Sequence, residues 1–195
     1  MSDLLTKYRN VASKKGGVLL SSSITGKKLQ WQCNEGHTFW LTAYKVHKRG
    51  KWCQMCGSSK GERAIREVLK ELNVIFVPQY KLPVCHRRRY DYYFEFNNRR
   101  FIIEYDGEQH FNFVRRYHRK KCKFVESQII DRIKTYYAWN SGITIIRIDY
   151  TQLDNIRQHI INGINCGAVV YLSTPQLYKY ITDINITSQD FILYS

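Results

Sequence analysis

The sequence predicts an α/β protein of the α+β kind, in which a mixed sheet with helices packed against it follows a small metal-ordered domain. Three observations predict this fold. Helix-period apolar stripes and β-branched or aromatic runs succeed one another in the order αβββαβα across residues 59–163. A two-residue turn signal joins two of the strands, and closely spaced Cys and His residues precede them all. We expect domains at residues 1–58 and 59–165, with 166–195 as a C-terminal extension.

The first domain has the spacing of a tetrahedral zinc site. Cys33-x3-His37 is followed after fifteen residues by Cys53-x2-Cys56. Two close pairs let four ligands converge with little chain strain, and a site without an open position is structural rather than catalytic. A region this small needs a metal to order it, because it buries too little apolar surface alone. The alternative is a set of free buried cysteines beside a surface histidine.

The second domain is predicted to open with a helix and a strand. Ser59-x-x-Glu62 is a capping box, and the apolar stripe that follows predicts a helix through about Leu72. Glu62 is interpreted either as a helix-capping residue or as a metal ligand, and the two roles can coexist. A short strand from Val74 to Tyr80 comes next.

A β-hairpin is the most informative element. Asn97-Asn98 forms a two-residue turn, so directly paired residues have numbers that sum to 195. This register places Asp91 opposite Glu104 and turns Asp106 to the same face. Opposed carboxylates are destabilising unless a proton, an Arg or Lys, or a divalent metal neutralises them. Hard oxygen ligands favour Mg²⁺ or Mn²⁺ here. The alternative is a solvated sheet edge that carries surface acids.

The remaining elements follow the hairpin in order. We expect a basic linker from Gly107 to about Val125, then a helix to about Asn140 that ends before Gly142. The β-branched run 143–148 predicts a strand buried on both faces, and Thr151 opens a helix through about Ile161. Residues 166–195 could pad the core, add a strand or mediate a homodimer, and the spacing does not decide among these.

Charge indicates the class of partner. Lys and Arg number 31 against 16 Asp and Glu, which gives a net charge of +15 and a pI near 9.6. A polyanion is the expected partner, with nucleic acid as the leading candidate. Tyr117 and His118 could stack on bases between the cations, although a charge run is also compatible with a solvated loop. The candidate phosphate contacts on this segment are Arg115, Arg116, Arg119, Lys120, Lys121 and Lys123.

The sequence predicts an intracellular protein that does not enter a membrane. No apolar run approaches the ~20 residues of a membrane span, and the start lacks a signal-peptide core. The six cysteines form no evident disulfide framework, which fits a reducing compartment. Cys85, Cys122 and Cys166 are predicted to be ordinary thiols. The sequence does not decide between nucleus and cytoplasm.

Residues 11–57 resemble a zinc-ribbon module found in large DNA viruses, phages and bacteria. The likeness rests on a Gly16-Gly17 lead-in, a W-x-C-x-x-x-H segment and a G-x-W-C-x-x-C close. The matching residues are Trp31, Cys33, His37, Gly50, Trp52, Cys53 and Cys56. Such modules often precede nucleases, so the resemblance implies a nucleic-acid-binding domain.

Residues 59–163 resemble the PD-(D/E)XK nuclease superfamily, in particular its very-short-patch-repair-like and homing-endonuclease-like branch. The likeness is carried by Gly61-Glu62, Asp91, the I-E-Y-D-G-x-Q-H-F segment around Glu104, Asp131-x-x-Lys134, Gly142-Ile143 and Ile146-Arg147-Ile148. The resemblance implies a restriction-endonuclease-like αβββαβ core. It also implies that Asp91, Glu104 and the Tyr105 carbonyl hold Mg²⁺ or Mn²⁺, with Asp106 and His110 near the attacking water.

One position departs from the superfamily pattern. The lysine expected two residues after Glu104 is replaced by Asp106. Lys134 is the natural substitute and Gln109 is another. The alternative for Lys134 is an exposed i,i+3 ion pair with Asp131.

The expected function is that of a metal-dependent DNA endonuclease or nickase acting on duplex DNA. Metal-assisted attack suits the sequence because neither a Ser/His/Asp set nor a Cys/His pair accompanies the acids. Lys134 and Arg147 would offset phosphate charge, and His110 is either catalytic or a structural hydrogen-bonding residue. The alternative is a nucleic-acid-binding protein on a nuclease-derived scaffold without catalysis. Homing, repair and structure-specific cleavage are not distinguished, and RNA stays open as a substrate.

Overall fold

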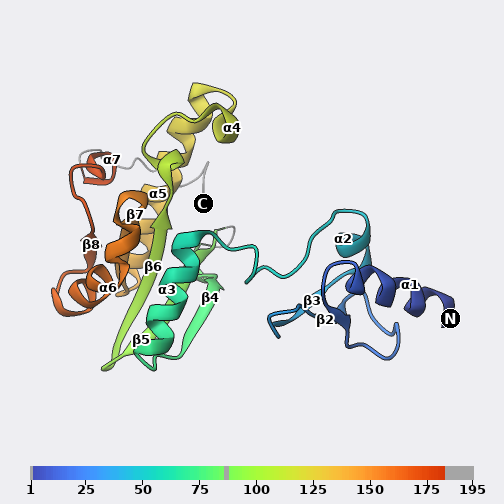
Figure 1. The fold of residues 1–195 in the computed structure, drawn as a ribbon. Helices are drawn as coiled ribbons and strands as arrows, with labels where there is room; N and C mark the ends of the chain where they lie inside the picture. Colours follow the sequence, from blue (N-terminus) through green and yellow to red (C-terminus); the bar gives the residue numbers. More distant parts are fainter. Residues whose placement is uncertain (1, 86–87, 183–195) are drawn as a thin grey trace. The chain divides into compact units, whose positions relative to one another are not determined.

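The computed structural model describes residues 2–85 and 88–182. The chain divides into two compact units, Met1–Ser59 and Lys60–Ser195, which are described separately below (Figure 1). Among the described residues, no helix is long and apolar enough to cross a membrane.

The first unit is a three-stranded antiparallel sheet with helices around a small apolar core. Trp31 is fully buried at its centre, and the Trp52 ring packs edge-on against it. Gly17 is required for close packing, because a Cβ there would lie 2.1 Å from the Gln32 carbonyl oxygen and 2.7 Å from the Trp52 ring. The elements are α1 (Ser2–Ser13), β1 (Val18–Leu19), β2 (Leu29–Gln32), β3 (Thr38–Leu41) and α2 (Ala43–His47).

The second unit contains a five-stranded mixed sheet in the order β4-β5-β6-β7-β8. The first three strands pair antiparallel, and β7 and β8 are added parallel to β6. The strands are β4 (Phe76–Tyr80), β5 (Tyr90–Phe96), β6 (Arg99–Asp106), β7 (Thr144–Asp149) and β8 (Val170–Leu172). The predicted mixed sheet is confirmed.

The hairpin of β5 and β6 has the predicted register. Tyr93 pairs with Ile102 and Glu95 with Arg100, so paired numbers sum to 195. The turn is built by Asn97 and Asn98 at φ of 48° and 59°, the left-handed values that a type I′ turn requires.

Helices cover both faces of this sheet. On one face, α3 (Lys60–Glu71) and α6 (Ile156–Asn165) pack their apolar stripes against β5, β6 and β7. On the other, α5 (Lys121–Asn140) covers Ile102 and Ile145 (Figure 1). As predicted, α5 ends before Gly142, which has a φ of +66°. The Gly142 and Ile143 amides donate back to Trp139 and Ala138, a Schellman cap.

Two sequence-based boundaries need correction. The predicted linker 107–125 is largely helical: it holds a 3-10 turn η1 (Glu108–His110), the short α4 (Arg115–His118) and the first residues of α5. Lys and Arg are good helix formers, so a basic run need not be a loop. The helix expected from Thr151 begins as the 3-10 turn η2 (Tyr150–Asn155), which Asp149 caps by accepting from the Thr151 amide.

The C-terminal segment belongs to the second unit. Strand β8 extends the sheet beside β7, and the short α7 (Lys179–Thr182) follows it. Tyr178, just before α7, is fully buried. Of the roles left open for residues 166–195, the described part therefore adds a strand and fills the interior. Residues 183–195 lie outside the described part.

Candidate active site and metal centre

The four expected zinc ligands of the first unit come together. The His37 Nδ1 atom lies 3.4 Å from the sulfurs of Cys33 and Cys56 and 3.7 Å from that of Cys53. The Cys33 and Cys56 sulfurs are 3.5 Å apart. A tetrahedral zinc ion with bonds of about 2.3 Å to sulfur would space its ligand atoms by roughly 3.5–3.8 Å. This Cys3His cluster could therefore bind a metal, as expected of a structural zinc site.

The structure places the strand acids of the second unit where β5 and β6 meet. The backbone pairing ends at Tyr92 with Ile103, one step before Asp91 and Glu104. Asp91 then departs from a regular ladder, because its Oδ2 atom accepts a hydrogen bond from the Tyr105 amide at 2.9 Å. Burial raises the pKa of the Asp91 carboxyl well above its usual range, and the nearby charge of Glu104 raises it further. The two carboxylates are thus close enough to repel each other.

Glu104 is buried, and only one of its two carboxylate oxygens accepts a hydrogen bond from the described residues. Its Oε2 atom accepts a hydrogen bond from Lys134 Nζ at 2.6 Å. Its Oε1 atom is also buried, and none of the described residues donates a hydrogen bond to it. Burial raises the pKa of Glu104, against the lowering effect of Lys134. A buried acceptor without a donor is costly, so this atom is where a cation would fit best.

Lys134 reaches the strands from the middle of α5. Its ammonium group lies 5.0 Å from the centre of the Tyr90 ring, and the Tyr90 hydroxyl donates to the Lys134 carbonyl. Because Lys134 and Asp131 are both buried, the exposed ion pair considered from the sequence is wrong. Lys134 instead lies beside Glu104 and donates to its Oε2 atom.

Asp106 and Arg147 form an internal ion pair. The guanidinium group donates from Nε and Nη2 to the two carboxylate oxygens of Asp106, at 2.8 and 2.6 Å, and both side chains are fully buried. Arg147 also donates to the Thr135 hydroxyl and the Asp131 carbonyl. Arg147, which was expected to offset phosphate charge, is fully buried among these partners. Asp106, enclosed in the same way, does not face water.

His110 pairs with Asp131 on α5. The ring Nδ1 atom lies 2.6 Å from Asp131 Oδ2 and 3.6 Å from Asp106 Oδ1, and the side chain keeps 24% of its surface exposed. Burial alone would lower the pKa of His110, but the Asp131 carboxylate outweighs it and raises the pKa to about 9. One ligand atom from each of Asp106, His110 and Asp131 also lies within 4.8 Å of the other two, close enough to share a metal ion. Arg147 and the protonated His110 together supply two positive charges for the two acids, so we interpret this cluster as an ion-pair network.

The other candidates lie around this centre. Glu62, on the first turn of α3, is half-buried, contributes to the raised pKa of Asp91, and accepts through its carbonyl from the Tyr92 hydroxyl. Gln109 is half-buried in η1, where its side chain folds against Gly107. The residue that donates to Glu104 is Lys134.

Two tyrosines of the C-terminal segment complete the network and were missed by sequence reasoning. The Tyr178 hydroxyl donates to Asp106 at 2.9 Å, and the Tyr180 hydroxyl donates to Asp131 at 3.3 Å. No motif or periodicity in that segment marks these residues. Their only signal is an unusual density of tyrosine.

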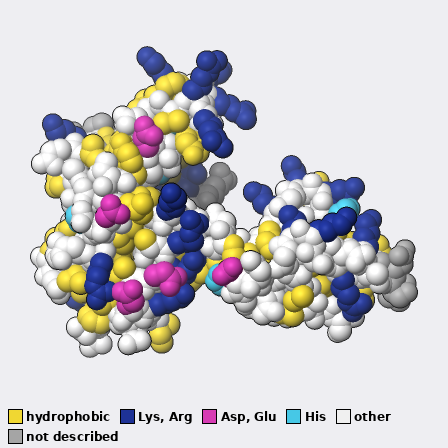
Figure 2. All heavy atoms as spheres, viewed as in Figure 1, with side chains coloured by type: hydrophobic (Ala, Val, Ile, Leu, Met, Phe, Trp, Pro, Cys, Tyr) yellow, Lys and Arg dark blue, Asp and Glu magenta, His cyan; other side chains and the backbone are white. Residues whose placement is uncertain are grey.

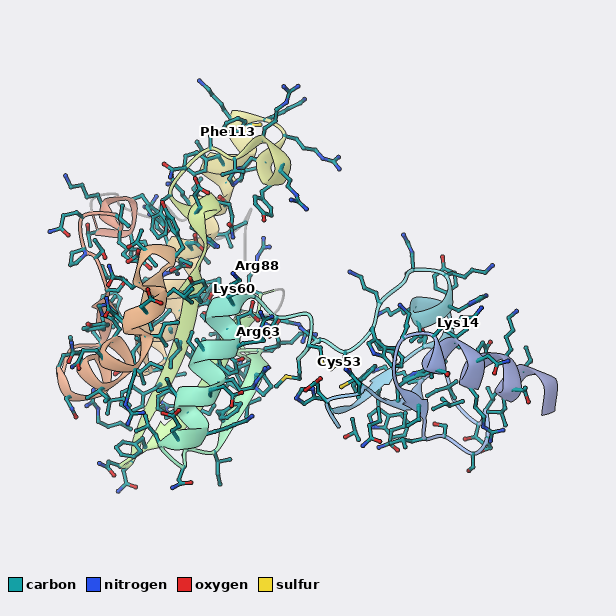
Figure 3. The ribbon with its side chains drawn as sticks, viewed as in Figure 1. Lys14, Cys53, Lys60, Arg63, Arg88 and Phe113 are labelled. Carbon is teal, nitrogen blue, oxygen red and sulfur yellow. The ribbon has the colours of Figure 1, made fainter. Side chains whose placement is uncertain are left out.

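The basic segment is exposed, as expected of a binding surface. Its cations project from α4 and the start of α5 (Figure 2), beside the exposed aromatic rings of Tyr117 and Phe113, the latter labelled in Figure 3. His118 differs from the expectation, because it is buried against Phe124 and accepts from the Val114 amide through Nδ1. The exposed members are Arg115, Arg116, Arg119, Lys120, Lys121 and Lys123.

Further cations surround the beginning of α3. Lys60 and Arg63 lie on its first turn, exposed, and Arg88 lies two residues before β5 (Figure 3). The same turn of α3 carries the acidic Glu62.

Comparison with known protein families, with curated proteins and with solved structures finds no match for this chain.

Proposed function

We propose that the protein is a metal-dependent DNA endonuclease or nickase of the PD-(D/E)XK type. One observation carries the proposal: Glu104 is buried beside Asp91 with one oxygen bound to Lys134 and the other without a donor among the described residues. A structural ion pair would satisfy both oxygens. A carboxylate poised between a lysine and a second acid instead suits a site that holds a divalent cation and a phosphate together.

Asp91 and Glu104 would hold the cation, with the Tyr105 carbonyl and Glu62 as further oxygen donors. Mg²⁺ or Mn²⁺ supplies a water of lowered pKa and stabilises charge on the phosphate. Lys134 would stabilise the negative charge that develops on the non-bridging phosphate oxygens. Its position is fixed by Glu104 and by the Tyr90 ring, so little reorganisation is needed during the reaction.

At neutral pH the attacking water would lose its proton to solvent, because His110, with a pKa raised to about 9, is already protonated and could accept a proton only at higher pH. Asp131 holds Nδ1, so Nε2 is the nitrogen directed elsewhere, and the ring is partly exposed. Asp106 is fully enclosed by Arg147 and Tyr178 and supports the network instead. In the reaction the water oxygen bonds to phosphorus, the P–O bond to the leaving strand breaks, and the leaving oxygen is protonated from solvent.

The proposal is tested by incubating zinc-loaded protein with supercoiled plasmid and added Mg²⁺ or Mn²⁺. Asp91→Asn and Glu104→Gln should abolish the conversion to relaxed or linear DNA, and Glu108→Gln, at an exposed acid of η1, should not. The metal-free control omits the added ion and avoids a chelator, because a chelator would also strip the Cys3His cluster. The ratio of relaxed to linear product separates nicking from double-strand cleavage.

A non-catalytic nucleic-acid-binding protein is the second candidate. It is favoured by the pairing of Lys134 with Glu104 and of Arg147 with Asp106, which neutralises two acids without a metal. This candidate predicts that the wild type and both acid variants bind DNA and retard it on a gel. None of the three should cleave any of a set of plasmids that together sample many sequences.

A further inference from the structure

The first unit contains a cavity that is lined by its own residues. Its volume is about 920 Å³, and it is formed by β3, α2 and the turn that carries Cys53. This volume is at the upper end of the roughly 300–1,000 Å³ usual for ligand sites. The argument below rests on its aromatic and basic lining residues: Trp40, Tyr44, Trp52, Lys45, Arg49 and Lys51.

Two aromatic rings of this lining are directed away from the core. Trp40 is 56% exposed and Tyr44 is 61% exposed. Trp40 alternates on β3 with Phe39 and Leu41, which pack into the apolar core, so strand geometry turns the Trp40 ring outward. A third ring, that of Trp52, has a buried Nε1 that finds no acceptor among the described residues. The cavity thus offers flat apolar faces.

The charge of the lining is entirely positive. Lys45, Arg49 and Lys51 are exposed, and no Asp or Glu in the described part of the chain lines the cavity. Flat apolar faces beside several cations complement a ligand that is both flat and anionic. Nucleic acid has these two properties, with base faces for the rings and phosphates for the cations.

The exposed rings favour unpaired bases over a duplex. In a duplex each base face is covered by its neighbours, so an aromatic side chain reaches a face only where the strand is single or a base is turned out. We propose that this cavity binds a single-stranded segment of nucleic acid, with bases stacked on Trp40 and Tyr44 and phosphates held by Lys45, Arg49 and Lys51. The inference rests on the proposed nucleic-acid partner and is independent of hydrolysis.

The test measures binding by zinc-loaded, full-length protein without added Mg²⁺, using the anisotropy of fluorescein-labelled oligonucleotides. The probes are a short oligothymidine, the matching oligouridine and a duplex of equal length. Trp40→Ala and Tyr44→Ala should each weaken single-strand binding about tenfold and leave duplex binding within about twofold. The matched control is Trp139→Ala, at a tryptophan of α5 that is 52% exposed, and it should change neither.

Unchanged single-strand affinity in both aromatic variants would overturn the inference. So would an equal loss for duplex and single strand, because the rings would then not select unstacked bases. Lys45→Gln with Arg49→Gln, two exposed positions, provides a second test should an aromatic variant lose its zinc, and it should weaken binding and flatten its salt dependence. Normal single-strand binding without plasmid cleavage would contradict the proposed hydrolysis and would leave the single-strand site supported. Tighter binding of the oligouridine would identify RNA as the ligand, and tighter binding of the oligothymidine would identify DNA.

Discussion

Lys134 Nζ lies 2.6 Å from Glu104 Oε2, which joins the middle of α5 to β6 across a separation of 30 residues. Both side chains are buried, so neither charge is stabilised by bulk water. The pair therefore holds a helix on the sheet and keeps a cation beside the candidate metal ligands.

Removal of one partner of this pair should be strongly destabilising. Lys134→Ala leaves the Glu104 carboxylate buried without its cation, and we expect a loss of about 3–5 kcal/mol in the free energy of unfolding. The double variant Lys134→Met with Glu104→Gln should recover most of this loss, because it removes the buried charges together. Urea denaturation measures both. A cost below about 1 kcal/mol for Lys134→Ala would be that of a solvent-exposed pair and would contradict the arrangement.

The His110–Asp131 pair should make stability depend on pH. The pKa of His110 is raised from 6.5 to about 9 in the folded protein, chiefly by Asp131 against the opposing effect of burial. A raised histidine pKa stabilises the fold fully below pH 6.5, and this contribution is lost as pH rises through 9. The free energy of unfolding should fall over that interval by up to about 3 kcal/mol.

His110→Gln should flatten this pH profile. His47→Gln, an exposed histidine of the first unit, serves as the matched control and should leave the profile unchanged. Denaturant midpoints measured across the interval give the comparison. A wild-type profile parallel to that of His110→Gln would show that the pair does not form.

The Cys3His cluster should bind one zinc ion per chain. Cys53→Ser removes a ligand, so the purified variant should lose the zinc and the near-ultraviolet dichroism of the tryptophans packed beside the cluster. Cys122→Ser, at an exposed cysteine outside the cluster, should retain both. Metal analysis by mass spectrometry provides the zinc stoichiometry. Zinc retained in full by Cys53→Ser would exclude this ligand set.

The C-terminal segment should stabilise the second unit through Tyr178. Its hydroxyl donates to the buried Asp106, so Tyr178→Phe removes one hydrogen bond to a charged group. The expected cost is about 2 kcal/mol in the free energy of unfolding. Tyr117→Phe, at an exposed tyrosine, should cost less than about 0.5 kcal/mol. An equally small loss of unfolding free energy in the two variants would show that the Tyr178 hydroxyl does not bond to Asp106.

The basic segment of residues 115–123, called the basic arm below, should dominate the salt dependence of duplex binding. Neutralising three exposed cations of the arm should lower the slope of log affinity against log salt by about 2.7, since each phosphate contact contributes about 0.9. A triple control elsewhere on the second unit should leave the slope within about one unit of that of the wild type. The arm variant changes Arg115, Arg116 and Lys120 to Gln, and the control changes Lys70, Arg157 and Lys179 to Gln. Equal slopes for both triples would place the binding surface elsewhere.

Sequence reasoning worked best where the evidence was local. The Asn97-Asn98 turn fixed the hairpin register, and the confirmed pairs of β5 and β6 follow from it. Boundaries failed in the segment after β6, because helix propensity in a basic run gives no periodic apolar signal. The segment therefore looked like a linker although α4 and the start of α5 lie there.

The sequence by itself determined the order of the main helices and strands in residues 59–163, the hairpin and the Cys and His spacing, since each depends on residues close together in the chain. Only the tertiary structure decided which charges meet. Lys134 reaches Glu104, Arg147 reaches Asp106 across 41 residues, and Tyr178 reaches Asp106 across 72. Periodicity indicates which face of a helix or strand is buried. It does not set the position of α5 along the sheet, and that packing determines the partner of every buried charge.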